Sequence, residues 1–131
     1  MTHAAGIVPM LAVADAAAAL DFYVRGFGGE VVEKMCDADG RVAHAEVRIG
    51  DARFMVNDEY PDHGAVSPAR LGGSPVLLLL TCGNVDTALE RALAAGATLD
   101  RPVQDGVVRN AKLRDPAGHR WMLAEPARRF R

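Results

Sequence analysis

The order of apolar and polar positions predicts eight short strands and two helices. Helical spacing of apolar residues follows Asp15 and Asn84, two good N-cap residues, and glycines end both helices. Period-two alternation or short apolar runs predict strands at residues 7–13, 30–35, 42–49, 52–57, 76–82, 97–103, 107–114 and 119–124. The order strand, helix and three strands therefore occurs twice.

The chain contains an internal duplication. DGRVAHAEVRIGDARFMV at residues 39–56 matches DGVVRNAKLRDPAGHRWML at residues 105–123, with a one-residue slip in the turn. We therefore predict one α+β domain over residues 1–131, built from tandem βαβββ modules at 6–58 and 75–125. Residues 59–74 are rich in Pro, Gly, Asp and Ser, which favours a linker over the alternative of a lid above a pocket.

Strand alternation assigns side chains to opposite faces of each sheet. We name the side expected to pack on a helix the near face and the opposite side the far face. The far-face set comprises Val42, His44, Glu46, Arg48, Arg53, Met55, Asn57, Asn110, Lys112, Arg114, Arg120, Met122 and Ala124. The two far faces could enclose a cleft with an asymmetric polar lining, since Glu46 and Lys112 are equivalent in the repeat, or they could be solvated outer surfaces.

Composition excludes several classes of function. A formal net charge of −2 over 131 residues gives no basic field for nucleic acid. The longest apolar run, residues 75–81, is far shorter than the about 20 residues that span a bilayer. The beginning of the chain lacks a signal-peptide pattern, and the two cysteines form no C-x-x-C motif. We expect a cytoplasmic protein with neither a nucleic-acid nor a membrane partner.

The sequence resembles the vicinal oxygen chelate superfamily, which includes glyoxalase I, extradiol dioxygenases and bleomycin resistance proteins. The resemblance lies in MLAVADAAAALDFYVRGFGGEV at 10–31, GRVAHAEVRIGDARFMVND at 40–58, NVDTALERALAAGATLDRPV at 84–103 and RDPAGHRWMLAE at 114–125. ALDFY, HAEVRIGD and DPAGHRW are most similar to the glyoxalase/bleomycin resistance branch and its PhnB-like proteins. The resemblance implies curled mixed sheets around a small-molecule cleft, and a homodimer.

The same resemblance places the metal ligands of the metal-using members at four positions of this chain. Here these positions are Val8, Met55, Leu77 and Met122. A hard or borderline divalent ion needs oxygen or imidazole ligands, and a thioether suits only soft ions such as Cu(I). We therefore predict no metal and no other cofactor.

The candidate ligand-binding residues are His44, Glu46, Arg48, Arg53, Met55, Asn57, Leu77, Leu79, Asn110, Lys112, Arg120 and Met122. His44 and Glu46 are the catalytic candidates: they could form an acid–base couple, contribute to an improvised metal site, or be hydrogen-bonded wall residues. The cationic residues could bind an anionic group, or form ordinary surface ion pairs. The apolar ones could form an adaptable pocket floor, or simply fill the core.

The leading functional hypothesis is a metal-independent protein that binds or sequesters a partly apolar small molecule, such as a drug or metabolite. The alternative is a glyoxalase- or dioxygenase-like lyase or isomerase, with a displaced metal site or metal-free chemistry at His44 and Glu46. The sequence alone does not decide whether the protein is an enzyme.

Overall fold

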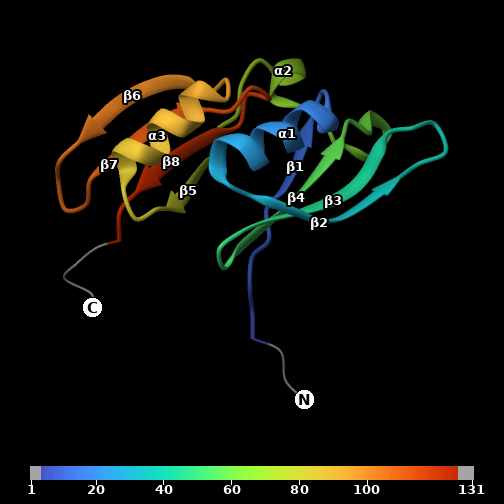
Figure 1. Cartoon of the computed structure of the whole chain (residues 1–131). Helices are drawn as coiled ribbons and strands as arrows, with labels where there is room; N and C mark the ends of the chain where they lie inside the picture. The colour runs from blue at the N-terminus through green and yellow to red at the C-terminus, as the bar shows by residue number, and fades with distance from the viewer. Residues whose placement is uncertain (1–3, 127–131) are drawn as a thin grey trace.

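The computed structural model describes residues 4–126 and contains two consecutive units of the predicted kind (Figure 1). The first unit comprises β1 (Met10–Val13), α1 (Ala16–Phe27), β2 (Glu30–Cys36), β3 (Val42–Ile49) and β4 (Ala52–Asp58). The second unit comprises β5 (Leu77–Thr81), α3 (Val85–Ala94), β6 (Thr98–Gln104), β7 (Asn110–Arg114) and β8 (Arg120–Ala124). The chain between them forms η1 (Pro61–His63) and α2 (Pro68–Leu71). The predicted α+β fold class is confirmed.

Each unit forms a four-stranded mixed sheet, and the two sheets have the same topology. Their strand orders are β1-β4-β3-β2 and β5-β8-β7-β6, and only the first pair in each order is parallel. Met55 pairs with Met10 and Glu46, as Met122 pairs with Leu79 and Lys112. Residues that the repeat makes equivalent in sequence therefore occupy equivalent places in space.

Side-chain oxygens satisfy the free N–H groups at the start of both long helices. The predicted caps are confirmed: Asp15 accepts from the Ala18 amide at 3.1 Å and Asn84 from the Thr87 amide at 3.0 Å. A carboxylate at or just beyond the end of the module's last strand also reaches each helix. Asp58 accepts from the Ala16 amide at 2.8 Å and Glu125 from the Val85 amide at 3.0 Å. Of the helices within residues 4–126, none has the length and hydrophobicity needed to cross a membrane.

The near faces of both sheets pack into a single shared core. The Trp121 ring of β8 lies 5.4 Å from that of Phe54 in β4 and 4.9 Å from that of Phe27 in α1, centroid to centroid. α1 and α3 pack against each other between the sheets (Figure 1). Because helices and aromatic rings fill the space between the near faces, the two far faces lie on the outside of the chain.

A buried carboxylate joins the two modules. Asp115 is only 3% exposed, and its Oδ2 accepts hydrogen bonds from the Tyr23 hydroxyl at 2.5 Å and the Trp121 Nε1 at 2.9 Å. Its Oδ1 accepts from the His119 amide at 3.0 Å, and the His119 Nε2 lies 2.9 Å from the Ala12 carbonyl of β1. The RDPAGH turn therefore stabilises itself and also connects the second module to the first.

Residues 59–74 are folded around Glu59. Its carboxylate accepts from the Ser67 amide at 2.9 Å and pairs with the Arg70 guanidinium at 3.1 Å. α2 then packs against the β7–β8 turn, where a Cβ on Gly118 would come within 2.9 Å of Pro68. The sequence of this segment shows no periodicity because its folded structure depends on these few longer-range contacts.

Replacement of Tyr23 by Phe tests the link between the modules. Loss of the hydroxyl leaves the buried Asp115 carboxylate with one donor fewer, and a hydrogen bond to a charged group contributes about 2 kcal/mol. We expect Tyr23→Phe to lower the free energy of unfolding by about this amount in urea titrations.

The matched control is Tyr60→Phe, because Tyr60 makes the same kind of bond, 2.5 Å to Asp37, on the exposed surface. This variant should change stability far less. Equal losses in the two variants would contradict a special role for the buried bond.

Protonation of Glu59 at low pH should break its ion pair with Arg70 and so destabilise residues 59–74. Hydrogen bonds from Arg70, and then from Ser67, lower the pKa of Glu59 to about 2. Because the folded-state pKa is depressed, this contribution to stability is complete above the ordinary carboxyl pKa and is lost as the pH falls toward about 2. We expect the carboxyl carbon of Glu59 to titrate near pH 2 in NMR spectra.

Arg70→Gln removes the largest cause of that shift and should move the midpoint upward, toward 4.5. A midpoint near 4.5 in both proteins would contradict the role assigned to this pair.

Candidate functional site

The predicted site residues form two groups on the outside of the chain. The first far face carries His44, Glu46, Arg48, Arg53, Met55 and Asn57, and the second carries Leu77, Leu79, Asn110, Lys112, Arg120 and Met122. The assignment of alternate strand residues to the near and far faces is supported by the burial of near-face positions such as Val47 and Leu113. The sequence left open a cleft between the two far faces or two solvated outer surfaces; in the structure the near faces share the core.

Glu46 is held by two arginines on the first far face. Arg48 Nε donates to its Oε2 at 2.8 Å, and Arg53 Nη2 donates to its Oε1 at 3.3 Å. These side chains leave Glu46 only 7% exposed, although it lies on the far face. The hydrogen bond from Arg48, assisted by the charge of Arg53, lowers the pKa of Glu46. Glu46 is thus an ionised carboxylate with both oxygens engaged.

The contacts of Glu46 count against the acid–base couple of His44 and Glu46 that the sequence suggested. His44 is half-buried opposite Met35, two residues from Glu46 on the same strand. Among residues 4–126, the side-chain hydrogen bonds of Glu46 go to arginines and not to His44. A carboxylate with a lowered pKa is a poor proton donor near neutral pH. The described contacts therefore place Glu46 in an ion-pair network.

The second far face has a different balance of charges. Lys112 and Arg120 are half-buried, and neither forms an ion pair with a carboxylate of residues 4–126. Asn110 is engaged, since its side chain accepts from Arg101 and donates to the Val108 carbonyl. Leu79, which is 60% exposed, lies opposite Met122. This face thus presents cations beside an apolar strip.

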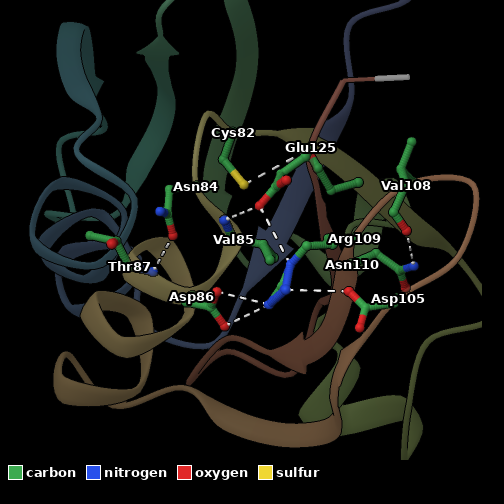
Figure 2. Close-up of polar contacts among 11 residues, drawn as sticks. Cys82, Asn84, Val85, Asp86, Thr87, Asp105, Val108, Arg109, Asn110 and Glu125 are labelled. Carbon is green, nitrogen blue, oxygen red and sulfur yellow. Dashed lines mark hydrogen bonds and ion pairs between the residues drawn. The ribbon is translucent and has the colours of Figure 1, made fainter. Parts of the chain in front are cut away.

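A further polar cluster, missed from the sequence, lies at the N-terminal end of α3 (Figure 2). Arg109 pairs with Asp86 at 2.8 Å and Asp105 at 3.3 Å, and lies 3.9 Å from the helix-capping carboxylate of Glu125. Cys82 donates to the Ala124 carbonyl at 3.7 Å, and burial raises the pKa of its thiol. The bonds fix the end of the second sheet to α3, and the thiol is not activated as a nucleophile.

Sequence comparison assigns the family. A profile of the Glyoxalase/Bleomycin resistance protein/Dioxygenase superfamily matches residues 2–123. The chain belongs to this superfamily. An uncharacterized protein of Mycobacterium bovis is 39% identical over 125 residues, which cover 92% of this chain and 82% of that protein.

Solved structures of the superfamily share the fold. TioX from Micromonospora sp. ML1 is 28% identical, with a TM-score of 0.72 over 94% of this chain and 97% of that one. The PhnB protein from Bacillus cereus is 23% identical, with a TM-score of 0.67 over 92% and 98% of the two chains. The latter likeness is one of fold alone, and it agrees with the PhnB-like resemblance of the sequence.

The four positions that the sequence resemblance assigns to the ligands of metal-using members carry residues that do not suit such an ion. The four ligand positions carry two aliphatic side chains, Val8 and Leu77, and two thioethers, Met55 and Met122. Oxygen or imidazole ligands for a hard or borderline ion are therefore missing at these positions. Residues 4–126 also contain no group of three or more His, Cys, Asp or Glu side chains arranged to hold a metal.

We expect the protein to retain well below one equivalent of metal after equilibration with Mn, Fe, Ni and Zn salts and desalting. The physical reason is the hydrocarbon and thioether chemistry of the four positions. Inductively coupled plasma mass spectrometry measures the content, and His44→Ala should leave it unchanged. Near-stoichiometric metal that is lost in His44→Ala would instead identify a displaced site at His44.

Proposed function

We propose that this protein binds a small, partly apolar molecule without a metal, in a cleft that a second copy of the chain completes. The observation that carries the proposal is the exposure of apolar side chains on the uncovered far faces. Met10 is 71% and Leu79 60% exposed. Met10 pairs with Met55, and Leu79 with Met122, so each far face has an apolar strip along its parallel strand pair.

The two far faces suit each other as opposite walls of one site. The first carries the Glu46 carboxylate with its two arginines, and the second carries Lys112 and Arg120. If the first far face of one copy covers the second far face of another, the methionines and leucines become a floor of adaptable apolar groups. A homodimer with two such clefts satisfies both faces of each chain.

Sequestration of a drug or metabolite in the cytoplasm is the biological role that we infer from this site. The alternative from the sequence, a glyoxalase- or dioxygenase-like lyase or isomerase, needs either a displaced metal or proton transfer by His44 and Glu46. Engagement of Glu46 by Arg48 and Arg53 counts against the second route. Binding without turnover is therefore the function that we favour.

Leu79→Glu tests the completed cleft. It places a charge on the apolar strip, where burial against a second copy would be costly. We expect the dimer dissociation constant to rise about tenfold or more, as measured by sedimentation velocity. The same substitution should abolish stabilisation by any ligand found in a thermal-shift screen of aromatic compounds and antibiotics, which at 100 times its dissociation constant gives about 2.7 kcal/mol.

Leu71→Glu is the matched control, because Leu71 of α2 is 67% exposed and lies outside both far faces. It should leave association unchanged. A monomeric parent protein, or equal effects of the two substitutions, would overturn the shared cleft. Turnover of a screened compound that His44→Ala removes would favour the enzyme.

A further inference from the structure

A hollow of about 530 Å³ lies between α2 and the β7–β8 turn, at one end of the second far face. Pro68, Gly72 and Gly73 line one side of it, and the turn at residues 116–118 lines another. Asp100, Arg114 and Arg120 supply the charged groups of its wall. The superfamily's four metal-ligand positions are not among its lining residues.

The hollow has an excess of positive charge. Arg114 and Arg120 are directly opposite each other on β7 and β8, an arrangement that is unfavourable for like charges. Arg114 Nε donates to Asp100 Oδ1 at 2.9 Å. Arg120 has no ion-pair partner within residues 4–126, although it is half-buried. Two guanidinium groups therefore line the hollow with one carboxylate, which is bound to Arg114 alone.

Charge neutralisation differs between the two far faces. On the first, Arg48 and Arg53 both bond Glu46, so the chain supplies its own anion. On the second, Lys112 lies two residues from Arg114 on the same face and adds another cation without a carboxylate partner among residues 4–126. An anion from outside the chain would compensate these charges.

The walls of the hollow are fixed by contacts elsewhere in the fold. A Cβ on Gly118 would lie 2.9 Å from Pro68, so α2 and the turn are closely packed. Asp115 anchors the turn through Tyr23 and Trp121, and Glu59 anchors α2 through Ser67. The arginines are therefore presented from a prearranged surface, which reduces the cost of binding.

We propose that this hollow binds the acidic group, carboxylate or phosphate, of a small molecule, with the guanidinium groups of Arg120 and Arg114 as donors. The planar guanidinium donates paired hydrogen bonds that match both kinds of anion. Leu77 and Met122 adjoin Arg120 on the same face, so an apolar part of the molecule can continue along the strip. In that respect the inference rests on the proposed function, and it defines the ligand class as an amphiphilic organic anion.

Inorganic phosphate and sodium acetate are the probes, titrated at constant ionic strength maintained with sodium chloride. Proton–nitrogen NMR spectra follow the Nε–H signals of Arg114 and Arg120 and the amide of Gly118. We expect saturable shifts at these groups with at least one probe, and the preferred probe distinguishes a phosphate from a carboxylate site. Arg120→Gln should weaken the binding about tenfold or more.

Arg25→Gln is the control, since it removes the same charge from an exposed pair with Asp21 on α1. It should leave the titration unchanged, and unfolding midpoints of both variants show that each is folded. Linear shifts spread over the surface, or equal weakening in the two variants, would overturn the anion site. Leu79→Glu should keep the phosphate or acetate response even if it prevents dimerisation, so failure of the cleft and failure of the hollow can be distinguished.

Discussion

The arrangement of the two modules depends on the buried carboxylate of Asp115. A charge at 3% exposure is tolerated only when its oxygens are hydrogen-bonded, and Tyr23, Trp121 and the His119 amide supply three donors. Burial, reinforced by the charge of Asp115, raises the pKa of Tyr23 well above its ordinary value, so the phenol remains a donor. Since Tyr23 belongs to the first module, this interaction favours packing of near face on near face.

The sequence repeat explains why the two modules have the same fold. Positions at which the two copies differ explain the contact that joins them. Asp58 and Glu125 occupy equivalent positions, and each ties the end of its sheet to the start of its helix. By contrast, the turn equivalent to the Asp115 turn contains Gly50 and Asp51 and makes no corresponding link among the described residues. The duplicated unit thus folds in the same way twice, while a different and one residue longer turn in the second module supplies Asp115, which accepts the hydrogen bond that Tyr23 of the first module donates.

Much of the fold could be read from the sequence because strand and helix periods are local. The caps Asp15 and Asn84, the repeat and the facing of Val47 or Leu113 all follow from such patterns. Alternation along a strand predicts which face of its own sheet a residue occupies, but it does not predict which faces of two sheets pack together. The sequence therefore left open whether the far faces enclose a cleft or form solvated outer surfaces, whereas the structure shows an aromatic core that joins the near faces.

The charges of the candidate site were visible in the sequence, but their pairing was not. Glu46 and Lys112 occupy equivalent positions in the two modules but have opposite charges. This difference determines whether each far face contains a counterion for its arginines. Glu46 draws Arg48 and Arg53 into a neutralising network. Lys112, in the same place on the second sheet, adds charge to a face that already holds Arg114 and Arg120, with Asp100 bound to only one of them. A ligand lying between such faces would direct its acidic end to the second sheet, because the first already provides its own counterion.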